Sequence, residues 1–189
     1  MDHFDTEHLN KDSAAATLAQ WQDRAAVMRD AMPTPGVARP DQVATLTGLE
    51  VFDAMFRGEL PYPPIAQTLD FTIAHWSRGR ADFLGTPRFA HYNPLGSVHG
   101  GWIATLLDSA VGCAVHTTLA PGKMYTTIEL KVNYVRAVTD GVPMLLSAAR
   151  VIHVGARIAT ADGRLLGPDG TLYAHATTTC LIFDPPVKP

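Results

Sequence analysis

The chain has 189 residues, of which 47% are hydrophobic and 17% are charged, and its formal net charge is −3. This composition excludes a disordered chain and provides no basic surface for nucleic acid. The sequence contains no run of about 18 apolar residues, so no membrane span is predicted. The first residues lack the apolar segment of a signal peptide. We therefore expect a cytoplasmic protein with neither nucleic-acid nor membrane partners.

Residues 1–64 are predicted to form a helical extension that ends in a proline-rich linker. Within 13–30 the apolar side chains recur at helical spacing, and Ser13 is the expected N-cap. The members of this apolar stripe are Leu18, Trp21, Ala25 and Met28. Prolines interrupt residues 32–40, and residues 61–64 are expected to be extended.

A second short helix is predicted over 48–57. Thr47 and Glu50 have the spacing of a capping box, and Gly58 suits the C-terminal end. Helices of this length are marginal in isolation. We therefore expect the extension to pack on the main domain.

From residue 68 onward the sequence alternates as strands do. One long helix, over 99–119, interrupts them. The predicted strands cover 69–78, 80–90, 125–137, 142–154, 157–166 and 171–183. Short turns join most of them, so the pairing is expected to be antiparallel and the fold class α+β.

The strand over 125–137 is predicted to present two different faces. Its polar side chains fall on one face and its apolar side chains on the other. The polar set is Thr127, Glu129, Lys131 and Asn133, and the apolar set is Ile128, Leu130, Val132 and Tyr134.

The start of the long helix carries the strongest functional signal. The segment runs Asn93-Pro-Leu-Gly-Ser-Val-His-Gly-Gly, and an apolar helix containing Asp108 follows directly. The first N–H groups of a helix have no intrahelical partner, and glycine lets a ligand approach them closely. They can stabilise a carbonyl oxygen that becomes negative, while a carboxylate acts as base or nucleophile. A turn into a buried helix, with Asp108 as a satisfied polar residue, explains the segment equally well.

Asp108 lies on a helix face of small residues. At about 100° per residue this face also holds Gly101, Ala104, Gly112 and Val115. The opposite face holds Ile103, Leu106, Ala110 and Cys113. Small side chains allow close approach of a ligand or of another protein chain, and a lone carboxylate there is costly to bury without partners.

Metal and redox chemistry are not indicated. Cys113 and Cys180 are far apart in sequence and sit in apolar segments, so we expect two buried free thiols. The histidines have no metal-ligand spacing. No metal site and no cofactor are expected.

These motifs resemble the hotdog-fold acyl-CoA thioesterases of the phenylacetate-pathway (PaaI-like) family. The resemblance rests on Asn93, the His99-Gly100-Gly101 turn, the helix with Asp108 and the following Tyr-Thr-Thr-Ile-Glu-Leu-Lys-Val-Asn-Tyr strand. It covers residues 65–184, which leaves 1–64 as an extension and 185–189 as a tail. It implies an antiparallel sheet around a long central helix, in a homodimer or homotetramer.

The resemblance also implies the roles of individual residues. Asn93 and the Gly100 N–H would contact the thioester carbonyl, Asp108 of the other subunit would act as base or nucleophile, and Thr127 would orient the water. The substrate-binding region would include His99, Gly101 and Trp102. His99 either braces the loop or acts as a base, and Trp102 either packs or contacts substrate.

Three functions follow from these expectations. The first is hydrolysis of an aryl-acetyl or medium-chain acyl-CoA to the free acid and CoA. The second is an acyl-thioester hydratase or dehydratase, although His99 and Asp108 lie on roughly opposite sides of an ideal helix. The third is a hotdog protein that binds acyl-CoA without turnover.

Overall fold

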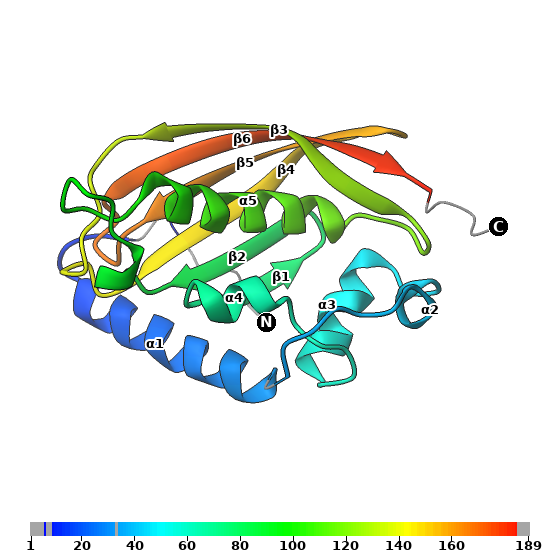
Figure 1. The fold of residues 1–189 in the computed structure, drawn as a ribbon, viewed down its shortest axis with the longest axis horizontal. Helices are drawn as coiled ribbons and strands as arrows, with labels where there is room; N and C mark the ends of the chain where they lie inside the picture. The colour runs from blue at the N-terminus through cyan, green and yellow to red at the C-terminus, as the bar shows by residue number, and fades with distance from the viewer. Residues whose placement is uncertain (1–5, 7–8, 33, 185–189) are drawn as a thin grey trace.

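The computed structural model describes residues 6, 9–32 and 34–184, and the predicted tail 185–189 lies outside them. Six antiparallel strands form one sheet in the order β1-β2-β4-β5-β6-β3. The sheet curves around the long helix α5 (Gly100–His116), as Figure 1 shows. The strands are β1 (Phe71–Ser77), β2 (Arg80–Gly85), β3 (Met124–Tyr134), β4 (Leu145–Val154), β5 (Ile158–Leu166) and β6 (Leu172–Phe183). The predicted α+β body with one central helix is confirmed.

The core lies between α5 and the concave face of the sheet. Leu106, Leu107 and Val111 of α5 are fully buried there. A Cβ on Gly163 of β5 would lie 2.9 Å from Cγ1 of Val111, so this strand needs glycine to accept the helix so closely. The helix is therefore held rigidly against the sheet.

Two predicted strands are shorter than the pattern indicated. The strand predicted over 80–90 ends at Gly85, because Pro87 cannot donate to a ladder and a 3-10 turn over Phe89–His91 follows. The strand predicted from residue 142 begins at Leu145, just after Pro143. In the first case a proline follows the end of the strand, and in the second case a proline precedes its start. Neither proline can donate to the ladder.

The two predicted faces of β3 are wrong at Thr127. The register with β6 shifts between Thr127 and Glu129, which is the mark of a β-bulge at Ile128. Thr127 therefore points inward to α5, while Ile128 and Glu129 are both exposed. Lys131 beyond the bulge is exposed as predicted.

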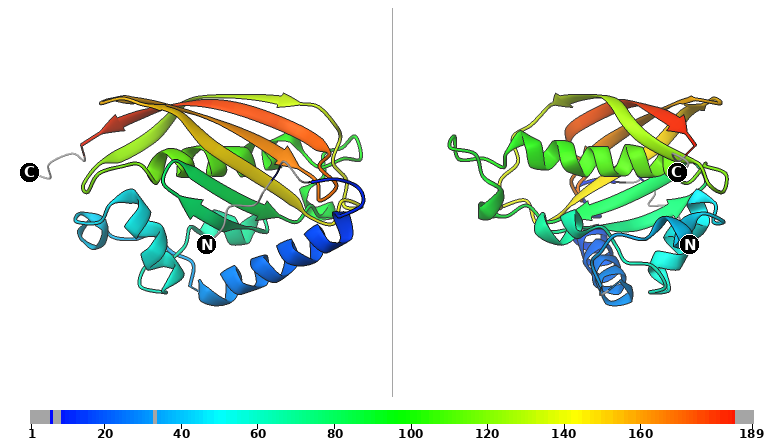
Figure 2. Two further views of the ribbon diagram at one scale, coloured as in Figure 1. Left: turned by 180° about the vertical axis from the view of Figure 1, so that it is seen from behind. Right: turned by 45° about the vertical axis from the view of Figure 1, so that its right-hand side comes forward.

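The N-terminal helices pack on the main domain, as expected. They are α1 (Ala14–Ala31), α2 (Pro40–Val43), α3 (Gly48–Phe56) and α4 (Pro64–Thr68). Seen from behind in Figure 2, α1 runs along β1 and β2 on the side away from α5. Trp21 and Ala25 of α1 are buried there against Leu84 and Leu146. The extension thus covers the convex face of these strands.

Two local predictions in the extension need correction. Ser13 occupies the N-cap position of α1 as predicted but makes no side-chain cap hydrogen bond, because its hydroxyl instead donates to the Asn10 carbonyl at 3.2 Å. Residues 61–64 were expected to be extended, but Pro64 begins α4, where a proline in the first turn costs no hydrogen bond.

Helix α3 docks on the C-terminal end of α5. The predicted capping box is present: the Thr47 hydroxyl accepts from the Glu50 N–H at 3.2 Å, and the Glu50 carboxylate accepts from the Thr47 N–H at 2.7 Å. The Gly48 N–H donates to the Leu119 carbonyl at 3.0 Å. A Cβ on Gly48 would lie 1.7 Å from the His116 carbonyl oxygen, so only glycine fits this contact.

Among the helices of the described residues, none is long and apolar enough to cross a membrane.

Candidate functional site

The loop before α5 is closed by its own side chains. The Asn93 amide donates to the Ser97 hydroxyl at 3.1 Å, and its oxygen accepts from the Leu95 N–H at 2.8 Å. His99 is the N-cap of α5, and its Nδ1 accepts from the Gly101 N–H at 2.8 Å. His99 thus braces the turn, and the Gly101 N–H is already engaged and is not offered to a ligand.

Gly100 presents the free donor of this turn. Its N–H has no acceptor among the residues that the structure describes. The Tyr134 hydroxyl donates to the Gly100 carbonyl at 3.0 Å, and a Cβ on Gly100 would lie 3.1 Å from the Tyr134 ring. Tyr134 was missed as a site residue, because a tyrosine at the end of an alternating strand carries no distinguishing signal.

Asp108 is held by β3. It is half-buried, and its Oδ1 accepts a hydrogen bond from the Thr127 hydroxyl at 3.1 Å. The bulge at Ile128 is what turns Thr127 toward the helix. A carboxylate with one hydroxyl partner retains oxygen lone pairs that can accept a proton from water.

A cluster of weakly acidic groups surrounds Asp108. Burial raises the pKa of the Cys113 thiol to about 12, and the negative charge of Asp108 adds to the shift. Burial likewise raises the pKa values of Tyr125 and Cys180, again with a contribution from Asp108. Cys113, Tyr125 and Cys180 therefore stay protonated at neutral pH.

The assignment of helix faces needs a correction around Cys113. Cys113 is half-buried beside Tyr125, on the side of Asp108, whereas Val115 is fully buried. The half-buried stripe of α5 consists of Ala104, Thr105, Asp108, Ser109, Cys113 and His116. Only Cys180 is the buried thiol that the sequence predicted.

Trp102 is packing rather than a substrate contact. It is 4% exposed, its ring stacks on His91 with centroids 5.2 Å apart, and its indole N–H donates to the Leu69 carbonyl at 2.8 Å. Its ring and its donor are therefore used inside the fold, and it is not available to a ligand.

Gly100 and Asp108 are too far apart to act on one carbonyl group within one chain. Eight residues of α-helix span about 12 Å, while a reacting carbonyl needs both groups within about 3 Å. The pairing of His99 with Asp108 that a hydratase needs is also absent within the chain, since the His99 Nδ1 caps the helix.

A depression of about 270 Å³ lies beside the Gly100 end of α5. Its lining includes Asn93, Gly100, Tyr134 and Arg136. Tyr134 and Arg136 are exposed, so this depression opens to solvent. The structure thus brings Asn93 and Gly100 together at one end of α5, and Asp108 and Thr127 together two turns further along.

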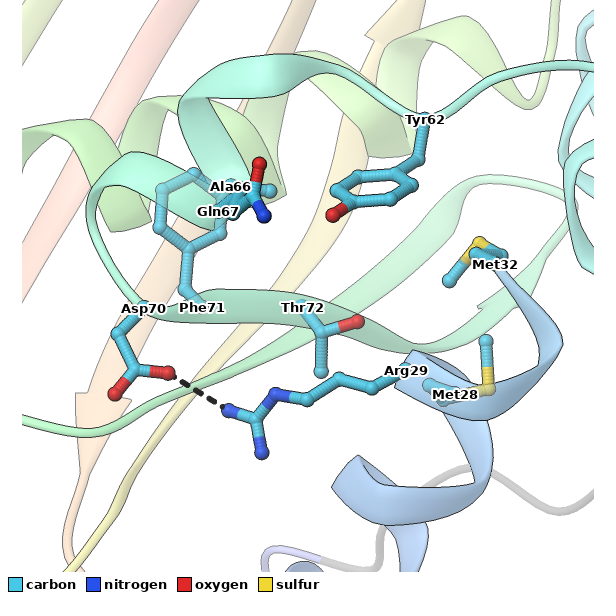
Figure 3. Close-up of a pocket in the computed structure, with 9 residues that line it drawn as sticks. All are labelled: Met28, Arg29, Met32, Tyr62, Ala66, Gln67, Asp70, Phe71 and Thr72. Atoms are coloured by element: carbon cyan, nitrogen blue, oxygen red, sulfur yellow. Dashed lines mark hydrogen bonds and ion pairs between the residues drawn. The ribbon is translucent and has the colours of Figure 1, made fainter. Parts of the chain in front are cut away.

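A second pocket, of about 220 Å³, lies in the N-terminal part of the chain. Figure 3 shows it between α1, α4 and the start of β1, with the Arg29–Asp70 ion pair at 3.0 Å on one side. None of the predicted site residues lines it. Within the described part of the chain, no group of three or more His, Cys, Asp or Glu side chains is arranged to hold a metal ion.

Comparison with known proteins identifies the family of the chain. The family model of the thioesterase superfamily matches residues 95–174, which include the α5 turn and β3. A phenylacetic acid degradation-related protein from Ralstonia eutropha JMP134 is 32% identical, and the match covers 69% of this chain and 98% of that one, with a TM-score of 0.63. The chain belongs to the thioesterase superfamily. The predicted hotdog fold and the resemblance to PaaI-like thioesterases are confirmed.

Two further relatives fit the same family. The phenylacetic acid degradation protein PaaI of Thermus thermophilus, solved as a mutant protein, is 26% identical over 62% of this chain and 97% of its own, with a TM-score of 0.57. A curated Halobacterium salinarum protein with an esterase name is 36% identical over 84 residues. That match spans 54% of the Halobacterium protein. This chain is therefore a thioesterase-family protein of the hotdog fold, a family whose general chemistry is hydrolysis of acyl thioesters.

Proposed function

We propose that the protein is an acyl-CoA thioesterase whose site is completed by a second copy of the chain. One copy supplies Asp108 and Thr127, and the other supplies the Gly100 N–H with Asn93. The observation that carries the proposal is the separation of these two halves along α5, each half intact and each insufficient alone.

The free edge of the sheet supports this arrangement. β1 is flanked by the N-terminal helices, while β3 is the opposite edge of the sheet. The exposed fractions of Met124, Ile128 and Tyr134 are 47%, 55% and 54%. An open edge of this length with apolar side chains invites another strand.

Pairing of two β3 strands would bring the halves together. Thr127, near one end of β3, holds Asp108, and Tyr134, at the other end, holds Gly100. Antiparallel pairing about the middle of the strand lays the Thr127 end of one copy beside the Tyr134 end of its partner. The twofold symmetry then creates two equivalent sites.

Such a site can hydrolyse the thioester bond of the substrate. The thioester carbonyl accepts a hydrogen bond from the Gly100 N–H, which stabilises the negative oxygen of the tetrahedral intermediate. Asp108, oriented by Thr127, either removes a proton from the attacking water or attacks first, in which case water hydrolyses the acyl-enzyme. The C–S bond breaks, the thiolate takes up the proton, and the products are a carboxylic acid and CoA.

The expected substrates are aryl-acetyl or medium-chain acyl-CoA. An apolar acyl group gains about 25 cal/mol for each Å² that it buries, and a two-carbon group buries little. Acetyl-CoA is therefore expected to be a poor substrate.

Release of free thiol from a panel of acyl-CoAs tests the proposal. The wild-type protein should release thiol, and Asp108→Asn, which keeps the shape of the side chain but removes its charge, should lower kcat by about 10²-fold or more. A matched control is Asp162→Asn, which changes a carboxylate paired with Arg150 on β4 and should retain activity. Equal thiol release by Asp108→Asn and the wild type would refute the assignment of Asp108.

A further inference from the structure

We infer that Tyr125 ends the acyl pocket, and that α3 of the N-terminal extension holds Tyr125 in place and so sets the length of the acyl group. The inference rests on the proposed function, because it takes Asp108 as the group that meets the thioester. It assigns a role to a half-buried tyrosine and to a helix that the catalytic chemistry does not use.

Tyr125 of β3 lies against Gly112 of α5, which is one helical turn after Asp108. A Cβ on Gly112 would lie 3.2 Å from the Tyr125 hydroxyl oxygen, so the tyrosine occupies the space that a side chain at Gly112 would fill. Burial raises the pKa of the Tyr125 hydroxyl, and nearby Cys113, Cys180 and Asp108 add to the shift. A group that extends from Asp108 along α5 toward its C-terminus therefore meets the Tyr125 ring.

The acyl group is the part of the substrate that takes this direction. The copy that supplies Gly100 also supplies the depression with Arg136 at its rim. The nucleotide of CoA carries several negative charges, which are costly to bury away from a cation. The nucleotide therefore lies at this depression, beside Arg136, and the apolar acyl group lies between Asp108 and Tyr125.

Helix α3 supports Tyr125 through His116. The His116 ring lies between two aromatic rings, with centroids 5.3 Å from Tyr125 and 5.2 Å from Phe52 of α3. The position of α3 is fixed on α5, because the Gly48 backbone lies directly against the His116 carbonyl. The result is a continuous row of ring contacts from the extension to the wall of the pocket.

Phe56 offers a matched control on the same helix. Both Phe52 and Phe56 pack on Trp76, with ring centroids 6.4 and 5.7 Å away, but of the two only Phe52 has a ring contact with His116 in the described structure. Truncating either ring removes packing on Trp76, whereas only the Phe52 change releases the support of Tyr125.

The experiment measures kcat/KM for butyryl-, octanoyl-, dodecanoyl- and phenylacetyl-CoA and compares the ratio of dodecanoyl to butyryl. Tyr125→Ala should raise this ratio about tenfold or more, since one or two methylene groups in an apolar pocket are worth that factor. Tyr125→Phe keeps the ring and should keep the wild-type ratio. Phe52→Ala should raise the ratio by about threefold, and Phe56→Ala should leave it unchanged. Circular dichroism and melting curves show that each variant is folded, and Tyr125→Leu replaces Tyr125→Ala if the latter does not fold.

The outcomes separate this inference from the proposed function. An unchanged ratio in folded, active Tyr125→Ala or Tyr125→Leu overturns the inference and leaves the thioesterase assignment intact. Equal shifts in Phe52→Ala and Phe56→Ala overturn the part played by α3. A wild-type protein that releases no thiol from any of these esters overturns the proposed function, and this inference with it.

Discussion

At the scale of single residues, the polar groups of the α5 turn make separate hydrogen bonds. His99 occupies the Gly101 N–H, Tyr134 occupies the Gly100 carbonyl, and Asn93 closes the loop with Ser97. The Gly100 N–H is left without an acceptor among the described residues, next to the depression. A donor fixed in this way costs no reorganisation when charge develops on a carbonyl oxygen.

Replacing Gly100 tests the donor directly. Gly100→Pro removes the N–H and adds a ring at the first position of the helix, where proline is favoured, and it should lower kcat about 10²- to 10³-fold. Gly100→Ala is the control, because it adds a similar contact with the exposed Tyr134 ring but keeps the N–H. It should lose much less activity. Equal losses in the two variants, measured by thiol release, would mean that crowding of Tyr134 and not the donor matters.

At the scale of elements, the sequence predicted the existence of the long helix and the strands better than their contacts. The 3.6-residue period of α5 and the turn residues between strands are local signals. The bulge at Ile128 is not local, because it depends on how β3 pairs with β6, so the inward direction of Thr127 had to come from the family resemblance. The roles of Tyr125 and Tyr134 depend on contacts with distant elements and left no sequence signal.

The junction between α3 and α5 should make stability depend on pH. Burial lowers the pKa of His116 to about 4, from 6.5 in the unfolded chain. Between these values the unfolded chain binds more protons, so the free energy of unfolding falls as pH falls through this window. The loss from His116 between pH 7 and pH 5 should be about 2 kcal/mol.

Urea denaturation at the two pH values measures this loss. His116→Phe keeps an aromatic ring between Phe52 and Tyr125 but cannot titrate. The variant should therefore lose less stability on acidification than the wild type. The same dependence on pH in both proteins would assign the effect to other groups.

At the scale of the whole molecule, the extension and the open edge lie on opposite sides of the sheet. The N-terminal helices cover the β1 side and the convex face, whereas β3 has no neighbouring strand beyond it among the described residues. The sequence could indicate that the small residues around Asp108 allow the close approach of a ligand or of another chain. It could not show that the partners of Gly100 and Asp108, Tyr134 and Thr127, lie toward opposite ends of an edge strand, because that relation requires the sheet order.

A mixture of two inactive variants tests whether the site is shared. Asp108→Asn and Gly100→Pro chains, co-expressed and isolated together through two different tags, form mixed dimers with one intact site and one doubly defective site. If the chains associate at random, half of the dimers are mixed, so an untagged mixture should regain about a quarter of wild-type activity. Co-expression of Asp108→Asn with Asp108→Ala provides the control, since no intact site can form. A site contained within one chain would give no recovery in either mixture, because every chain would carry a defect in its own site.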